Sequence, residues 1–588
     1  MKKAKKLVAL LLIAALGTSA FAGCTGGGGN SSSKADSSGT TSSVSSKAES
    51  DSSPAADDDS KPDSEDTAAS GDTLLVGLTT SAMVTDYDNN YFTQYLEDKL
   101  GFDLEFYMLP AENTETRTKV ALMATSNESL PDVLVVDNHL TTEMILQYGS
   151  SGFFMPLNEY LEDASVMPNY NAIPDEDRAA MDKAQTMADG NMYSLSGFEP
   201  ETWNLTPNRM FINRAWLDTL GLSVPTTTDE LKDVLIAMRD GDPNGNGAKD
   251  ELGVYGFSAG GYGENVSASL MNSFVFWNGA GANGGLALSE DGAKVIAPFT
   301  TDEWREGLRY MNDLYNEGVF SANTFTDDST QFKAILNQDP PIVGFTSAGS
   351  LSNWPDVVDN ANFAEMEMIE PLIGPEGVQY SPYNEYSAGQ ELMILSSTNK
   401  LDMALKFADQ FFDHDTSIIE RFGEEDVDWS RDPALLAEHT NSYIEAGLYD
   451  KLNILVLSSV WSENQSQTWR NHGPRYASMD QGNTAFDFSS GKPFDPEDPT
   501  QLSARSYELY YPRHPEHILS PLKYTEEEAG KIQDPLTTLP DFVKQSLAEF
   551  VTGARDVEKD WDTYLAELDT MGLQQWIETA QVAFERDK

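Results

Sequence analysis

The sequence predicts an α/β fold with at least two lobes, and three observations lead to this prediction. Just after residue 72, apolar strand-like runs alternate with helix-like segments. Further along the chain, amphipathic helices carry clear start and stop signals. The chain beyond residue 72 has about 515 residues, which is more than one hydrophobic core normally organises.

The alternation is clearest in the first part of this body. The expected order is strand, helix, strand, helix, strand, over residues 73–79, 91–101, 104–108, 116–123 and 131–136. This order is typical of a doubly wound α/β lobe. Ligands in such sheets bind at the carboxyl ends of the strands. Asp137 and Asn138 follow the third strand at one such end.

Two later helices are marked by their ends. Thr227 and Glu230 stand three residues apart before an apolar series, which is the pattern of a capping box. A second amphipathic helix is expected after Thr301 and should stop at Gly318. Its Trp304 belongs to the apolar stripe, so we expect this side chain in the core.

The N-terminus has the pattern of an export signal. Four lysines within residues 2–6 precede the apolar run Leu7–Leu16, and small residues follow. The alternative is a retained membrane helix, but spanning a bilayer needs roughly 20 apolar residues. We therefore expect residues 1–23 to be a cleaved signal peptide.

Cys24 is the only cysteine of the chain, so no internal disulfide can form. It could be an incidental free thiol. The run Ala22-Gly23-Cys24, however, resembles the bacterial lipobox, which implies that Cys24 is lipidated and becomes the new N-terminus. The chain up to residue 72 is rich in Gly, Ser, Thr, Asp and Ala, a composition typical of a disordered tether. We expect residues 24–72 to be this lipidated tether.

The net charge excludes one class of partner. With 38 basic and 95 acidic residues, the formal charge is 38 − 95 = −57. A chain this acidic is repelled by nucleic acid and by an anionic bilayer. Solubility alone is the other explanation of the charge. We expect contact with the membrane through the lipid only.

The stretch Met210–Leu231 resembles a signature of extracellular solute-binding proteins, in which Phe-Ile-Asn is followed by Trp-Leu, Leu-Gly, Pro-Thr and Asp-Glu-Leu. Motifs near the C-terminus agree with the large lipoprotein type from Gram-positive bacteria: Tyr524-Thr-Glu-Glu-Glu, Glu549-Phe-Val-Thr-Gly, Asp560-Trp-Asp-Thr-Tyr and Met571-Gly-Leu. The resemblance covers the chain from about residue 73 to its end.

This resemblance implies a periplasmic-binding-protein-like fold of type II. Two α/β lobes, discontinuous in sequence within residues 73–588, would be joined by a hinge and would close on a solute in a cleft. The chain should cross between the lobes near residues 195–205. The resemblance further implies delivery of the solute to the permease of an ABC importer, with the protein lipid-anchored on the outer face of the cell membrane.

A candidate metal loop lies inside the expected second lobe. Oxygen-bearing side chains recur at every second position and a glycine occupies the sixth place, as in an EF-hand calcium loop. The candidate ligands are Asp242, Asn244, Asn246, the backbone carbonyl of Ala248, Asp250 and Glu251. The twelfth place is Gly253, so the usual glutamate is absent there, and the resemblance implies that Glu251 closes the shell. The alternative is a polar Asn-Gly turn. We expect calcium in a structural role.

The rival class is a secreted hydrolase. The chain has no His-Glu-x-x-His, and Pro515 between His514 and His517 disfavours a helical metal pair. A carboxylate pair for glycoside hydrolysis stays open, because 95 acidic residues always include candidates. We expect a binding protein and no enzyme. A secreted glycoside hydrolase or a static carbohydrate-adhesion module is the alternative.

Aromatic residues in loop-like segments indicate the class of ligand. Sugar-binding proteins place aromatic faces against pyranose rings. The candidates are Trp203, Trp277, Trp461 and Trp469. Burial in the core is the competing interpretation for each of them. Taken together, they favour an oligosaccharide over a peptide or a lipid.

Overall fold

A computed structural model describes most of the chain from Thr73 to Lys588. The residues left out within this range are 127–129, 199–204, 259–262, 264, 280–281, 350–364, 384–385, 387, 440–443, 445–449, 459, 461–463, 471, 478–483, 487–505 and 507–508. The expected signal peptide and tether, with Cys24, therefore lie outside the described residues. Within the described part, no helix is both long enough and apolar enough to cross a membrane.

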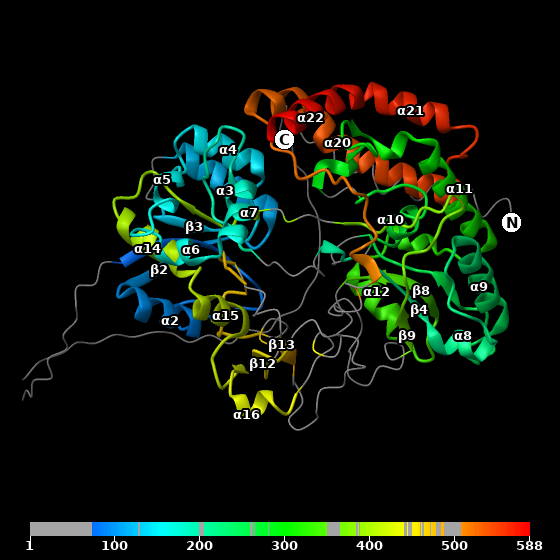
Figure 1. Ribbon diagram of the computed structural model, residues 1–588, viewed down its shortest axis with the longest axis horizontal. Coiled ribbons are helices and arrows are strands. Elements are labelled where there is room, and N and C mark those ends of the chain that lie inside the picture. Colours follow the sequence, from blue (N-terminus) through cyan, green and yellow to red (C-terminus); the bar gives the residue numbers. More distant parts are fainter. Residues whose placement is uncertain are drawn as a thin grey trace, which may run out of the picture. The chain divides into compact units, whose positions relative to one another are not determined.

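The first lobe is built on a four-stranded sheet with the order β10-β3-β1-β2, of which β2 and β3 are labelled in Figure 1. Strands β1, β2 and β3 run parallel, and β10 joins β3 antiparallel from far along the chain. Their bounds are β1 Thr73–Thr79, β2 Asp103–Leu109, β3 Val133–Val135 and β10 Leu392–Ile394. The helices are α2 Tyr91–Leu100, α3 Asn113–Thr125, α4 Thr142–Ser150, α5 Asn158–Leu161, α6 Pro168–Ala172, α7 Asp175–Gln185, α14 Leu401–Gln410 and α15 His414–Phe422.

Both faces of this sheet are buried. Val133 and Val135 of β3 point into one core cluster, whereas Leu134 between them points into another. Successive side chains of a strand alternate between the two faces, so a strand that is covered on both sides must be apolar throughout. This explains the unbroken apolar run in the sequence of β3.

A smaller sheet completes the first lobe. It consists of β11 Trp429–Ser430, β12 Ile454–Val456 and β13 Thr484–Phe486, in that order, and helix α16 Pro433–Leu436 lies beside β12. Trp429 and two residues of β12 belong to the same core cluster as β1 and β3. The chain beyond β10 thus returns to the first core.

The second lobe has its own four-stranded sheet, with the order β5-β8-β4-β9. Strand β5 runs parallel to β8, and β4 runs antiparallel to both β8 and β9. The strands are β4 Arg209–Asn213, β5 Leu252–Val254, β8 Val343–Ala348 and β9 Met366–Met368, with a separate pair β6 Ala287–Leu288 and β7 Val295–Ile296. The helices are α8 Arg214–Leu220, α9 Thr228–Gly241, α10 Val266–Met271, η2 Ala282–Gly285, η3 Pro298–Thr300, α11 Asp302–Glu317, η4 Ala322–Phe325 and α12 Ser329–Leu336.

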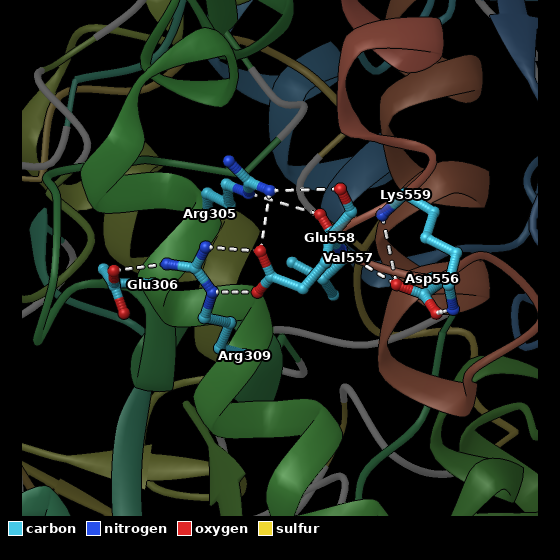
Figure 2. A network of polar contacts seen from close by, with 7 residues as sticks. All are labelled: Arg305, Glu306, Arg309, Asp556, Val557, Glu558 and Lys559. Atoms are coloured by element: carbon cyan, nitrogen blue, oxygen red, sulfur yellow. Dashed lines mark hydrogen bonds and ion pairs between the residues drawn. The ribbon is translucent and has the colours of Figure 1, made fainter.

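The C-terminal helices α20 Glu526–Thr552, α21 Trp561–Thr570 and α22 Leu573–Asp587 share the core of the second lobe. A polar network outside this core ties α11 to the segment between α20 and α21 (Figure 2). Arg305 and Arg309 both form ion pairs with Glu558, at 2.8 and 2.5 Å. The two arginines lie four residues apart, so they share one face of α11 and can hold one carboxylate together.

The α/β fold predicted from the sequence is confirmed. All five expected elements of the first lobe are present, although the ladder of β3 covers only Val133–Val135 of the strand expected over 131–136. The capping box of Thr227 and Glu230 opens α9. Helix α11 begins after the side-chain cap of Thr301 and ends at Gly318.

The chain passes between the two cores three times. Phe198 belongs to the first core and Met210 to the second, so the first passage lies between them. Leu372 belongs to the second core and Leu392 to the first, so the second passage leads back. The third passage leads from β13, which pairs with β12 of the first lobe, to residue 510 and the C-terminal helices, which belong to the second lobe. The position of the first crossover, expected near 195–205, stays a prediction because residues 199–204 lie outside the described ones.

Candidate functional site

Polar residues gather at the carboxyl ends of β1 and β3 in the first lobe. Asp137 and Asn138 follow β3, and both have positive φ angles, of 43° and 61°. Aspartate and asparagine tolerate this left-handed backbone better than most residues. The amide of His139 donates to the carbonyl of Val136 at 2.9 Å, which closes the turn. The turn leaves Asn138 exposed and 40% of the Asp137 side chain exposed.

His472 lies against this turn and against the end of β1. Its Nδ1 is 3.0 Å from the backbone carbonyl of Thr79, which can only accept, so Nδ1 carries the proton. Burial lowers the pKa of His472 to about 4, and the ring is therefore neutral at pH 7. Its Nε2 is 3.5 Å from Oδ2 of Asp137 and has no proton to offer. The oxygens of Asp137 thus remain available to a donor from solvent.

Asp137 is an acidic acceptor at the rim of this lobe. Burial raises its pKa to about 6, and the charge of Arg470 opposes that effect. The carboxyl group is therefore mostly ionised at neutral pH. A carboxylate beside an exposed amide offers hydrogen-bond acceptors and donors to hydroxyl groups. The first lobe therefore has a polar edge suited to a polyhydroxylated ligand, and we call it the β3 edge (residues 136–139 with Glu391 and His472).

The corresponding edge of the second lobe is also polar. Ser347, near the carboxyl end of β8, donates to the carbonyl of Gly263 at 2.9 Å and lies 3.3 Å from the hydroxyl of Ser269. Arg209, the first residue of β4, pairs with the end of β8 and donates to Ser506 at 2.7 Å. The buried hydroxyl of Thr346 has no hydrogen-bond partner among the described residues.

Two of the four candidate tryptophans lie in the cores. Trp469 is fully buried, and its indole N–H donates to Thr93 at 2.9 Å. Trp277 is 2% exposed and packs edge-on against Trp304, with the ring centroids 4.8 Å apart. A buried ring offers no face to a sugar, so the expectation that these two line a ligand site is corrected. Trp203 and Trp461 lie outside the described residues.

The candidate metal loop follows α9. Asp242 caps the helix with a φ of 48°, and its carboxylate accepts from the amide of Gly247 at 3.1 Å. Asn246 donates to Asp250 at 3.1 Å, and Asn244 donates to the carbonyl of Pro341 at 3.0 Å. Within the described residues, no three acidic, histidine or cysteine side chains converge closely enough to hold a metal ion.

Glu251 is the unusual member of this loop. Its side chain is 7% exposed, and neither carboxylate oxygen has a hydrogen-bond partner among the described residues. Burial raises its pKa, and the charges of Asp250 and Asp242 add to this effect. A buried carboxylate without a partner is costly unless a cation or a donor compensates it. The donor set of this loop, which is entirely oxygen, therefore fits a hard cation.

The structure also explains why the loop departs from the EF-hand pattern. Gly253, at the twelfth place, belongs to β5, and a Cβ atom there would lie 2.2 Å from the carbonyl oxygen of Val319. A glutamate therefore cannot stand at this place. Glu251 comes directly before the strand, where a long side chain has room.

Sequence reasoning missed the residues that surround the β3 edge from other parts of the chain. Glu391 comes directly before β10, and His472 lies in the segment Arg470-Asn-His-Gly-Pro. The only local signal for Glu391 is its place directly before an apolar strand. Nothing in the local sequence shows that β10 pairs with β3, so the proximity of Glu391 to Asp137 could not be predicted.

No family model matches the chain. Among curated proteins, it is 24% identical over 548 residues to the fructooligosaccharide ABC transporter substrate-binding protein FusA of Streptococcus pneumoniae, covering 89% of this chain and 94% of FusA. It is also 24% identical over 367 residues to lipoprotein LipO of Bacillus subtilis, covering 61% and 68% of the two chains.

Solved structures show the same fold. FusA in complex with kestose superposes with a TM-score of 0.69 at 22% identity, covering 88% of this chain and 99% of FusA. An EF-hand mutant of FusA with fructo-nystose gives 0.66 at 22% identity, with the same coverage. An "HMO binding" solute-binding protein of Bifidobacterium longum infantis gives 0.70 at 20% identity, covering 88% and 99%. In sequence and in fold, the chain is thus similar to a substrate-binding protein of an ABC transporter.

Proposed function

We propose that this protein captures an oligosaccharide outside the cell and delivers it to the permease of an ABC importer. The observation that carries the proposal is the similarity to FusA over nearly the whole of both chains, in sequence and in fold. The β3 edge supports it, because Asp137 and Asn138 offer polar groups at the carboxyl ends of parallel strands. The ligand would bind between the lobes, which close on it about a hinge.

The same proposal makes the protein a binder and not an enzyme. The relatives reported above carry the names of binding proteins and of a lipoprotein. Asp137 faces a neutral imidazole that is fixed by a backbone carbonyl, which suits a static acceptor rather than a group that moves protons. A binder returns its sugar intact, whereas a glycoside hydrolase shortens it.

Titration calorimetry with kestose tests the proposal. We expect saturable binding, and we expect Asp137→Ala to weaken it by about tenfold to a hundredfold, because a hydrogen bond to a charged group contributes about 1.5–3 kcal/mol. Asp103→Asn is the matched control: this exposed aspartate begins β2, at the opposite end of the same sheet. If the parent and Asp137→Ala bind kestose with equal affinity, Asp137 does not contact the ligand. Shortened sugar in the recovered ligand would favour the hydrolase.

We further propose that the chain is held on the outer face of the membrane by lipid attached to Cys24. Fractionation of cells tests this anchor. Cys24→Ser should release the protein into the soluble fraction, because without the thiol no acyl chain can be attached. Ser33→Ala in the expected tether is the control and should stay with the membranes. A Cys24→Ser protein that still sediments with the membranes would place the anchor elsewhere.

Calcium is the second part of the proposal. Asp242, Asn244, Asn246, the carbonyl of Ala248, Asp250 and Glu251 would hold it. The buried carboxylate of Glu251 supports this assignment. A second support is that the similar protein FusA has been described with an EF-hand mutation. The ion would fix the loop against the start of β5 and would have a structural role.

Thermal unfolding with and without a chelator tests the calcium site. A metal bound only by the folded state stabilises it by about 2.7 kcal/mol at a hundredfold excess over Kd, so the chelator should lower the Tm of the parent. In calcium, Glu251→Gln should have a lower Tm than the parent, because the site loses a charged ligand. In chelator, the variant should have a higher Tm than the parent, because it lacks the buried charge. Glu290→Gln, an exposed residue of the same lobe, is the control. If neither chelator nor calcium changes the Tm of the parent, the loop is an ordinary turn.

A further inference from the structure

Two segments through which the chain leaves or enters the first lobe lie together with a third segment of that lobe. They are Leu195–Phe198 and Gly389–Leu392, at the first and second passages, and His472–Ala477, which precedes β13. The amide of Leu195 donates to the carbonyl of Leu392 at 2.8 Å. The amide of Phe198 donates to the carbonyl of Arg475 at 2.8 Å. The roots of the first two passages are thus bonded to each other, and the first is also bonded to the third segment.

Glu391 lies where two of these segments meet the β3 edge. Its Oε2 accepts from the amide of Gly197 at 2.5 Å, in the first passage. Its Oε1 is 3.4 Å from the Asn138 side-chain amide, and its own carbonyl accepts from Val136 at 2.8 Å. The next residue back, Gln390, donates its amide to Oδ1 of Asn138 at 2.6 Å. One side chain therefore connects the ligand edge to two passages.

Two glycines make room for this carboxyl group. A Cβ atom on Gly389 would lie 2.6 Å from Oε1 of Glu391 and 2.4 Å from Oδ1 of Asn138. A Cβ atom on Gly197 would lie 3.2 Å from Oε2. The backbone of both segments therefore approaches the carboxyl group more closely than other residues would permit.

The third segment is held by a second carboxyl group. Oε1 of Glu420 on α15 accepts from the amide of Gly473 at 2.9 Å, and its side chain is fully buried. Burial raises the pKa of Glu420 well above its ordinary value, and the charges of Glu391 and Asp137 act in the same direction. All three segments are thus bonded within one group of acidic side chains.

The charges around Glu391 favour its neutral form. Burial raises the pKa of Glu391 to about 8, and the charge of Asp137 adds to this effect. Tyr386, just before β10, donates to the carbonyl of Gly197, and burial raises the pKa of its hydroxyl. His472 is neutral at pH 7, and Glu420 and Asp137 face the site from α15 and from the end of β3. The nearby cations are Arg421, Arg470 and the buried Arg475.

We propose that Glu391 is a positioning residue that couples the ligand edge to the segments joining the two lobes. A ligand that orders Asp137 and Asn138 would order Gly197 and Gly389 with them, because these residues share Glu391. The neutral carboxyl group would hold this junction together. Its ionisation places a buried negative charge beside Asp137 and loosens the junction. The inference rests on the proposed function, in which the lobes move relative to each other.

Hydrogen exchange of the unliganded protein tests this coupling by comparing variants at the same pH. At pH 5, Glu391→Ala should lower the protection of residues 195–198 and 136–139 about tenfold, because Gly197 and Asn138 lose a partner. Glu391→Gln keeps an acceptor and cannot ionise, so it should come close to the parent at pH 5. As the pH rises from 5 to 9 the parent should fall below Glu391→Gln in both segments, because an opened Glu391 ionises near its ordinary pKa whereas the buried group has a pKa of about 8. Helix α2 is the internal control and should not change.

Two results would overturn the inference. One is unchanged protection of residues 195–198 and 136–139 in Glu391→Ala. The other is a parallel change of protection in the parent and in Glu391→Gln between pH 5 and pH 9. Because exchange needs no ligand, the outcome is independent of whether kestose binds. Failure of the parent to bind kestose would count against the proposed ligand and would leave the exchange result standing.

Discussion

The antiparallel pairing of β10 with β3 is the contact on which the rest of the structure depends. It brings residue 392 beside residue 135 and closes the sheet of the first lobe. Without this pairing, Gln390 and Glu391 would have no reason to meet Asn138, and the chain would not return to the first core. The ligand edge and the roots of the passages between the lobes thus share one short ladder of three residue pairs.

A constraint of size explains why the chain needs such a return. About 515 residues are too many for one hydrophobic core, so two cores form. Each core is completed by a later part of the chain: β10 to β12 and Trp469 in the first, and the C-terminal helices in the second. Each core therefore combines segments that are far apart in sequence. The passages between the cores connect these segments.

The sequence was informative where the signal is local. The alternation of strands and helices up to β3, the capping box at Thr227 and the polar turn at Asp137 and Asn138 depend on neighbouring residues only. Burial of a particular aromatic residue depends on the whole fold. Trp277 and Trp469 stand in polar, loop-like sequences and yet fill the two cores, so their local surroundings suggested a site that the packing excludes. Glu391 escaped notice for the same reason, because its partners lie about 190 and 250 residues away in the chain.

Closure of the two lobes on a sugar is the central claim, and small-angle X-ray scattering of the protein with and without kestose tests it most directly. A receptor that binds between two lobes should become more compact, with a smaller radius of gyration that saturates at the same kestose concentration as the heat of binding. Binding that leaves the radius of gyration unchanged would contradict this account, and so would a contraction followed by the loss of intact kestose.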